Sequence, residues 1–170
     1  ICGALIGYTN AGKSTILNQV TSSKVLAEDK LFATLDPTSR RFVLPNNQET
    51  VITDTVGFLQ KLPHQLVKAF FSTLEEVTEA DYLLQVIDAS HPNLEGMLAT
   101  TKTIIESLKA ENIPMIYIFN KMDKVAKPNA VKKLLKDYEP KLFVSALEKD
   151  GVENIVTAIS DLLETYQDDI

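Results

Sequence analysis

The stretch GYTNAGKST, which begins at residue 7, contains residue types that hold nucleotide phosphates. It fits the pattern G-x-x-x-x-G-K-[ST], in which the glycines allow a tight turn and a close approach of the backbone to an anion. Lys13 would reach the terminal phosphates, and the Ser14 hydroxyl would bind Mg²⁺. We therefore predict a phosphate-binding loop composed of Gly7, Tyr8, Thr9, Asn10, Ala11, Gly12, Lys13, Ser14 and Thr15.

The segment DTVG, residues 54–57, places an acid and a glycine at the end of a second apolar run. An acid at the end of a strand can hold the Mg²⁺ shell through water, and the N–H of Gly57 can contact a γ-phosphate oxygen. The motif alone is weak, but its position downstream of a phosphate loop supports this interpretation. We predict that Asp54 helps to bind Mg²⁺ and that Gly57 contacts the nucleotide.

The segment LFATLDPT, residues 31–38, lies between these two motifs and contains two threonines. One threonine of this loop would complete the Mg²⁺ shell only while the γ-phosphate is present, which would make the loop a switch. Thr34 and Thr38 compete for this role, and Thr34 is favoured. We therefore predict Lys13, Thr34 and Gly57 as catalytic residues, and Ser14, Thr34 and Asp54 as the residues that bind Mg²⁺.

The segment NKMD follows another buried run and offers a carboxylate for base recognition. Asp123 can accept two hydrogen bonds from the N1–H and the exocyclic amine of guanine, a donor pair that adenine lacks. Asn120 would brace the neighbouring loops, and the stem of Lys121 would pack along the base. Ser145 and Ala146 follow a later apolar run, where the Ala146 N–H could meet the guanine O6. Together these residues favour GTP over ATP.

Short apolar runs alternate with longer amphipathic ones along the chain. This alternation predicts an α/β fold whose mostly parallel sheet carries helices on both faces. A short connection containing PNNQ predicts a hairpin, and therefore one antiparallel strand at a sheet edge. Ligands bind at the carboxyl ends of the strands in such sheets, where the motifs above lie. The predicted strands are 1–6, 40–44, 50–54, 82–88, 114–120 and 142–146, and the predicted helices are 13–21, 64–80, 92–112, 128–138 and 152–166.

The length of 170 residues, with 45% hydrophobic and 24% charged residues, suits one globular domain. The net charge of −6 argues against binding of a nucleic acid through bulk charge. No apolar run reaches the roughly 18 residues of a membrane span, and the N-terminus lacks a secretory signal. The single cysteine, Cys2, fits a reducing compartment. We expect a cytoplasmic domain over residues 1–170, cut from a longer protein because the chain starts with Ile1 rather than Met.

Four segments resemble the G domain of the HflX-type ribosome-associated GTPases, in the Obg/HflX group of translation-factor-related P-loop GTPases. They are GYTNAGKST, FATLDPTSRR, TDTVGFLQKLPHQLVKAFFSTLEEVTEADYLLQVIDAS and NKMD, and the likeness runs from about Cys2 to about Leu163. The resemblance implies a three-layer P-loop GTPase fold with a mixed six-stranded sheet, and Mg²⁺-dependent hydrolysis of GTP to GDP and phosphate. It also implies a molecular switch that acts on the large ribosomal subunit and its rRNA and is stimulated by it. Family members carry an N-terminal domain before the G domain, and we expect the isolated G domain to be a monomer.

Residue 58, directly after D-x-x-G, is a phenylalanine, whereas many GTPases have a glutamine there that orients the attacking water. Phe58 cannot hydrogen-bond to water, so two hypotheses stay open. Either Phe58 packs inward and another group, such as the backbone, orients the water, or intrinsic hydrolysis is slow and a partner completes the site. The alternative to an enzyme is a nucleotide-dependent binding scaffold with negligible hydrolysis. Asn10 resembles the asparagine with which potassium-activated GTPases hold K⁺ beside the phosphates, where the ion would supply positive charge. The alternative is that Asn10 stabilises its own turn.

Lysines cluster in and around the predicted helix 128–138. They form either an ordinary solvated face or a surface for rRNA on an otherwise acidic domain. The six lysines are Lys124, Lys127, Lys132, Lys133, Lys136 and Lys141.

Overall fold

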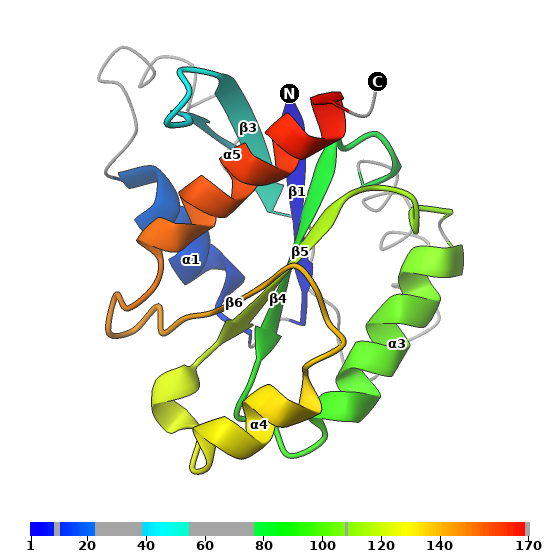
Figure 1. Ribbon diagram of the computed structural model, residues 1–170, viewed down its shortest axis with the longest axis vertical. Coiled ribbons are helices and arrows are strands. Elements are labelled where there is room, and N and C mark those ends of the chain that lie inside the picture. Colours follow the sequence, from blue (N-terminus) through cyan, green and yellow to red (C-terminus); the bar gives the residue numbers. More distant parts are fainter. Residues whose placement is uncertain (9–10, 23–38, 55–76, 108, 169–170) are drawn as a thin grey trace.

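The computed structural model describes residues 1–8, 11–22, 39–54, 77–107 and 109–168 of the chain (Figure 1). Within these residues, six strands form one sheet in the order β2-β3-β1-β4-β5-β6. The strands are β1 Cys2–Gly7, β2 Ser39–Val43, β3 Glu49–Asp54, β4 Tyr82–Asp88, β5 Met115–Asn120 and β6 Lys141–Phe143.

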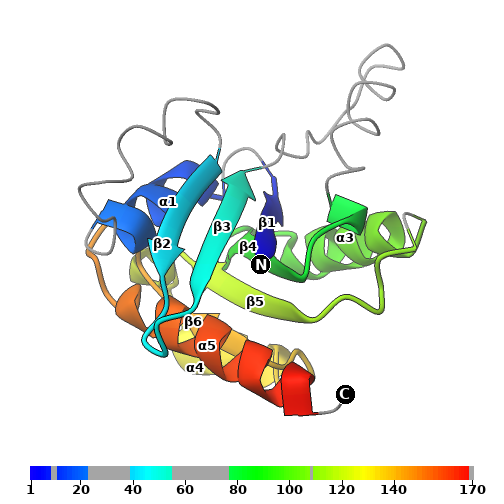
Figure 2. The same ribbon diagram turned by 90° about the horizontal axis from the view of Figure 1, so that it is seen from above.

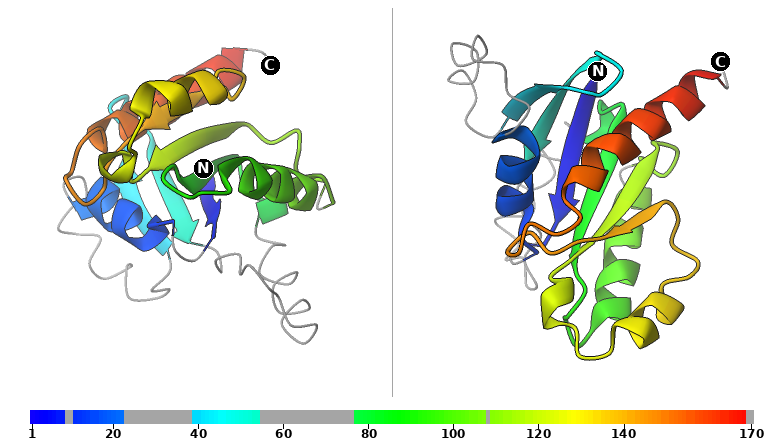
Figure 3. Two further views of the ribbon diagram at one scale, coloured as in Figure 1. Left: turned by 90° about the horizontal axis from the view of Figure 1, so that it is seen from below. Right: turned by 60° about the vertical axis from the view of Figure 1, so that its left-hand side comes forward.

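Helices cover both faces of the sheet. Helices α1 and α5 pack on one face, where Ile16 and Ile159 belong to the same core cluster. Helices α3 and α4 contribute Leu98 and the adjoining Leu135 to a cluster on the other face. Figure 2 and the left view of Figure 3 show α1 and α3 on opposite sides of the strands. The bounds are α1 Lys13–Ser22, α3 Leu94–Ser107, the 3-10 helix η2 Met122–Lys124, α4 Pro128–Leu134 and α5 Glu153–Asp168.

Neighbouring strands run parallel except β2 and β3, which form an antiparallel hairpin at one edge of the sheet. The hairpin turn closes where the Leu44 N–H donates to the Gln48 carbonyl oxygen at 2.8 Å. Asn47 has a φ of 67° in this turn, a left-handed conformation that asparagine tolerates. The predicted α/β fold with one antiparallel edge strand is therefore confirmed.

Strand β4 lies in the middle of the sheet and is buried along most of its length, because helices cover both of its faces. Leu84 and Val86 point into the cluster beneath α1 and α5, whereas Leu83 and Ile87 point to the opposite face. Gln85 lies between Leu84 and Val86 in the strand and therefore points to the opposite face, which α3 covers. Its polar side chain is buried there.

Helix α3 ends at Ser107 rather than at the predicted residue 112. Lys109 stops the helix because its φ of 58° is left-handed. Its N–H donates to the Glu106 carbonyl oxygen, and the Ala110 N–H donates to that of Ile105, both at 3.0 Å, which is the pattern of a Schellman motif. A lysine occupies the position where glycine usually marks such an end, so the sequence pattern concealed it.

Strand β6 also ends early, at Phe143 rather than at the predicted residue 146. Ser145 leaves the sheet and exchanges two backbone hydrogen bonds of 2.9 Å with Asp150. Helix α4 ends at Leu134 rather than at residue 138, and turns follow it.

Of the predicted helix 64–80, residues 77 and 78 are helical, and residues 64–76 lie outside the described part of the chain. Among the residues that the structure describes, no helix is both long and apolar enough to cross a membrane.

Candidate nucleotide-binding site

The predicted motifs follow strands whose carboxyl ends lie along one edge of the sheet. Parallel pairing places Leu5 of β1 opposite Asp54 at the end of β3. It also places Asp88 at the end of β4 opposite Asn120 at the end of β5. Because these strands share one direction, their carboxyl ends lie at this edge, which is where α/β folds bind their ligands.

Lys13, Ser14 and Asp54 form a polar cluster where the first turn of α1 meets the end of β3. The Lys13 Nζ lies 3.1 Å from Asp54 Oδ1, and the Ser14 hydroxyl donates to Asp54 Oδ2 at 3.2 Å. Lys13 is only 6% exposed, so its ammonium group requires the carboxylate partner that it has. The cluster therefore holds a buried cation and two hard oxygen donors side by side.

These oxygen donors fit Mg²⁺, which prefers carboxylate and hydroxyl oxygens and usually keeps waters and phosphate oxygens in its shell. No group of three or more His, Cys, Asp or Glu side chains that could hold a metal occurs among the described residues. Of the three predicted Mg²⁺ ligands, Ser14 and Asp54 lie together in this cluster, and Thr34 lies outside the described residues.

Asn120 connects the phosphate loop to the loop after β6. Its side-chain Nδ2 donates to the Ala11 carbonyl oxygen at 2.9 Å, and its Oδ1 accepts from the Ala146 N–H at 3.0 Å. Asn120 is 2% exposed, and Gly12, with a φ of 93°, passes so close that a Cβ there would clash with its Nδ2. The side chain predicted to brace the loops thus contacts two of them, and glycine at position 12 makes room for it.

Ala146 is bound from two sides. Its N–H, predicted to meet the guanine O6, donates to Asn120 in this structure, so the contact with the base stays a prediction. Its carbonyl oxygen accepts a hydrogen bond from the side-chain amide of Gln19 on α1. The loop after β6 is therefore tied both to β5 and to α1.

Asp123 and Ser145 form a pair across the two loops that are predicted to read the base. The Ser145 hydroxyl donates to Asp123 Oδ1 at 2.7 Å, and Ser145 itself is 2% exposed. The Glu148 N–H donates to the same hydroxyl oxygen at 3.3 Å. This network orients an exposed carboxylate, which is what a site needs to accept two donors from a guanine edge.

Asp88, which was not among the predicted site residues, contacts one of them, Lys121. Its Oδ2 lies 3.5 Å from the Nζ of Lys121, and its Oδ1 accepts from the N–H and the hydroxyl of Ser90 at 2.9 and 2.6 Å. Lys121 has a left-handed φ of 64°, so its backbone turns sharply out of β5. The available signal was an acid at the end of β4, the strand that pairs with the one leading into NKMD.

The other predicted nucleotide-binding residues have varied surroundings. Gly7 passes so close to β4 that a Cβ would clash with the Val86 carbonyl oxygen. Tyr8 is half-buried, Ala11 is buried and Thr15 is exposed on α1. Outside the described residues lie the predicted site residues Thr9, Asn10, Thr34 and Gly57, together with Thr38 and Phe58.

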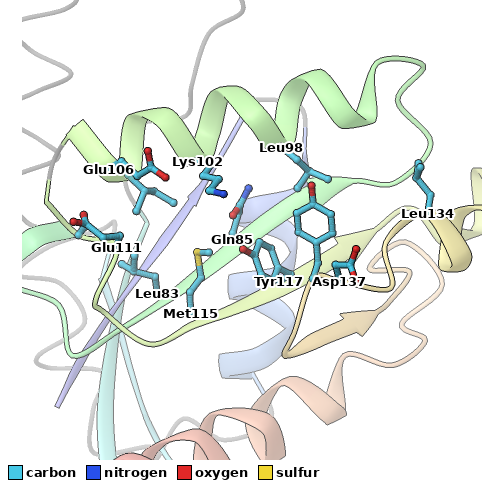
Figure 4. Close-up of a pocket in the computed structure, with 13 residues that line it drawn as sticks. Leu83, Gln85, Leu98, Lys102, Glu106, Glu111, Met115, Tyr117, Leu134 and Asp137 are labelled. Carbon is cyan, nitrogen blue, oxygen red and sulfur yellow. The ribbon is translucent and has the colours of Figure 1, made fainter.

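A cavity of about 500 Å³ lies away from these loops, between α3 and the sheet (Figure 4). Gln85 of β4 points into it from the sheet, and Lys102 reaches it from α3. Lys102 brings a positive charge to the lining, whereas Glu106 and Asp137 bring negative charges. The lining therefore indicates no single class of ligand. The predicted nucleotide-binding residues do not line this cavity.

The family model described as "50S ribosome-binding GTPase" matches residues 3–121 of the chain. A relative named GTPase HflX from Caldanaerobacter subterraneus is 45% identical over 156 residues, which are 92% of this chain and 35% of the relative. A second GTPase HflX, from Chlamydia pneumoniae, is 44% identical over 161 residues, which are 95% of this chain and 34% of the relative. The chain spans about a third of the length of these curated relatives.

Solved structures show the same architecture. A GTP-binding protein from Sulfolobus solfataricus, in complex with GDP, matches 97% of this chain and 53% of its own with a TM-score of 0.78 and 29% identity. The FeoB G-domain from Methanococcus jannaschii matches 96% of this chain and 97% of its own with a TM-score of 0.67, at 24% identity, and shows the fold alone.

The strand order, the phosphate loop before α1 and the Asp123–Ser145 pair together define a P-loop GTPase domain. The matches to the family model and to the relatives identify the family within this class of GTPases. The chain belongs to the 50S ribosome-binding GTPase family, as a G domain of the HflX type.

Proposed function

We propose that the chain binds GTP with Mg²⁺, hydrolyses it to GDP and phosphate, and acts as a switch on the large ribosomal subunit. The observation that carries this proposal is the position of Asn120, whose side chain joins the phosphate loop to the loop after β6. This connection supports the proposal that the Lys13–Asp54 cluster and the Asp123–Ser145 pair serve one bound nucleotide.

At the phosphate end, Lys13 would bind the terminal phosphates, while Ser14 and Asp54 would hold Mg²⁺. When bound, Mg²⁺ neutralises charge that develops on the phosphate oxygens during phosphoryl transfer. Lys13 contributes a second positive charge from a buried position, where electrostatic interactions are stronger than in water. Thr34 and Gly57 complete this part of the site in the proposal.

At the base end, Asp123 would accept the two donors of guanine, with Ser145 holding the carboxylate in place. Adenine would leave the carboxylate without these donors, and leaving a charged group unpaired costs about 1–3 kcal/mol or more. Lys121, held by Asp88, would lay its stem along the base plane.

Hydrolysis is proposed to be slow in the chain alone and faster on the large ribosomal subunit. Phe58 cannot orient a water molecule, so other groups must supply the catalytic positioning and charge. K⁺ held by Asn10 is the proposed source of part of this charge. The family description and the HflX relatives support the ribosomal partner, and a cytoplasmic location follows from that partner.

Multiple-turnover phosphate release from GTP, measured with and without large ribosomal subunits, tests this function. We expect release in Mg²⁺ that accelerates with subunits and is faster in KCl than in NaCl at equal ionic strength. Lys13→Ala serves as the control, because it removes the buried ammonium and should abolish release. Absence of release under every condition would favour the alternative, a nucleotide-dependent scaffold, and equal rates in the two salts would exclude the role of K⁺.

A further inference from the structure

Residues 121–141 differ in charge from the rest of the chain. They contain seven lysines and three acidic residues, a net charge of +4, within a chain of net charge −6. The remaining residues, with ten basic and twenty acidic side chains, therefore carry −10. A positive segment in an acidic domain can still attract an anionic partner. Salt screens the negative charges that lie farther away than the Debye length, which is about 8 Å at physiological salt.

These lysines lie along one continuous segment of the chain. Residues 121–141 form η2, the turn before α4, α4 itself and the turns that lead to β6. Figure 1 and the right view of Figure 3 show α4 at one end of the molecule, with the turns after it leading back toward β6. We call its six lysines the lysine surface; all are exposed except Lys141, which is half-buried: Lys124, Lys127, Lys132, Lys133, Lys136 and Lys141.

Most of these lysines form no ion pair within the part of the chain that the structure describes. Lys141 forms an ion pair with Glu139, and the Lys132 Nζ lies 5.3 Å from the centre of the Phe143 ring. The other four, Lys124, Lys127, Lys133 and Lys136, form no ion pair with any residue that the structure describes.

The lysine surface borders a hollow of about 480 Å³ between the loop after β4 and α4. Lys124 and Lys127 line it with Ser90, His91 and six apolar residues, which are Ala89, Val125, Ala126, Ala130, Val131 and Leu134. The hollow is therefore largely apolar, and the lysines on its border are the groups that a polyanion would contact.

We infer that the lysine surface binds the phosphate backbone of structured RNA, and that through it the domain contacts ribosomal RNA. The inference rests on the proposed function, since it assigns the contact with the large subunit to a particular surface. Lysines are point charges on flexible stems, and arginine, which forms the bidentate contacts typical of base reading, does not occur in residues 121–141. The surface should therefore recognise backbone phosphates without preference for sequence.

Charge reversal tests this assignment. Lys133→Glu combined with Lys136→Glu changes two exposed lysines that have no ion pair among the described residues. Lys102→Glu combined with Lys109→Glu is the matched control, because it reverses two exposed lysines on and just after α3 and lowers the net charge by the same amount. Binding is measured for the GTP-bound chain at several salt concentrations, with large ribosomal subunits and with protein-free ribosomal RNA.

We expect the Lys133/Lys136 variant to lose about tenfold in affinity for both probes near 0.1 M salt, and its log–log salt slope to become shallower by about 1.5. The control variant should keep the wild-type values. Equal losses in the two variants would overturn the inference and leave the proposed function intact. Weaker binding to subunits with unchanged binding to protein-free RNA would also overturn it, and would point to an acidic ribosomal protein.

Failure of the wild-type chain to bind subunits would count against the proposed function instead. The measurements on protein-free RNA would then decide the inference. A loss confined to the Lys133/Lys136 variant would support it, and binding that is absent or equal in all three proteins would overturn it.

Discussion

Asn120 and Gln85 are two buried carboxamides on neighbouring strands of the same sheet, and their surroundings differ sharply. Asn120 is 2% exposed and Gln85 is 3% exposed. Both polar ends of Asn120 are hydrogen-bonded, one to Ala11 and the other to Ala146. Gln85 forms no side-chain hydrogen bond with another described residue and points into the cavity under α3 (Figure 4).

The difference between these two side chains lies in whether the buried amide is hydrogen-bonded to other residues. An unpaired buried amide costs about 1–3 kcal/mol, whereas a paired one is close to neutral or favourable. At the carboxyl edge of the sheet, the cost is avoided by bonds that also hold the nucleotide loops together. In the middle of β4, the Gln85 amide forms no side-chain hydrogen bond with another described residue. Replacing Gln85 with an apolar residue should therefore raise the free energy of unfolding, whereas removing the Asn120 amide should lower it.

Asn120→Ala should give the largest effect. We expect the free energy of unfolding to fall by about 3 kcal/mol, because the variant leaves the Ala11 carbonyl and the Ala146 N–H without this partner. GDP affinity should fall as well, since the two loops lose their connection. Urea unfolding and GDP titration measure both quantities.

Asn112→Ala, at an exposed position in a turn, is the control for this substitution and should change stability by no more than about 0.5 kcal/mol. A loss below about 1 kcal/mol for Asn120→Ala would show that the bracing contacts contribute little.

Gln85→Leu should raise the free energy of unfolding by about 1 kcal/mol, because a similar volume of apolar side chain replaces a buried amide. Gln85→Glu should lower it, since it places a charge in the same position. Urea unfolding of the two variants beside the wild type measures the contrast. A loss of stability with leucine would mean that the amide has a partner worth keeping, and the contrast with Asn120 would disappear.

Tyr82 is a third buried polar residue, and its burial should make the free energy of unfolding depend on pH. Its hydroxyl lies 2.7 Å from the Thr50 hydroxyl, and burial raises its pKa while this hydrogen bond lowers it by less. The folded state therefore keeps the proton at pH values where the unfolded state, with a pKa of about 10, has lost it. This contribution to stability is complete below about pH 10 and is lost as the pH rises further.

Tyr82→Phe should accordingly cost about 1 kcal/mol at pH 7, through the lost hydrogen bond, and should weaken the fall in stability above pH 10. Unfolding curves between pH 7 and 11 test both parts. Tyr117 keeps some of the alkaline dependence in this variant, because burial raises its pKa too. An unchanged alkaline slope would show that Tyr82 does not titrate with unfolding.

Asp88→Asn should give the smallest effect of this series. The 3.5 Å pair with Lys121 is partly exposed, so its loss should cost about 0.5 kcal/mol, or a factor of about 2 in GDP affinity. Asp81→Asn, which changes an exposed acid that binds the Cys2 N–H far from Lys121, is the control for charge. The role of Asp88 fails if both variants bind GDP equally well.

Several elements could be predicted from the sequence because the signals that define them are local. Strand β4 has the predicted bounds, since its residues are apolar apart from Gln85 and the final Asp88. The hairpin between β2 and β3 could be predicted from the turn residues of PNNQ. Helix α3 was predicted to be too long, because Lys109 adopts a left-handed conformation that is not expected for a lysine. Asp88 escaped attention because one acid at the end of a strand has many possible roles.

The amino-acid sequence by itself determined the phosphate loop, the order of the motifs and the alternation of strands and helices. These features depend on residues a few positions apart, whose turn geometry and periodicity are encoded locally. The tertiary structure alone decided that Asn120 would bind Ala11, 109 residues away, and that Gln85 would face a cavity. Such contacts follow from sheet register and from which helix covers which face, and those depend on the packing of the whole chain.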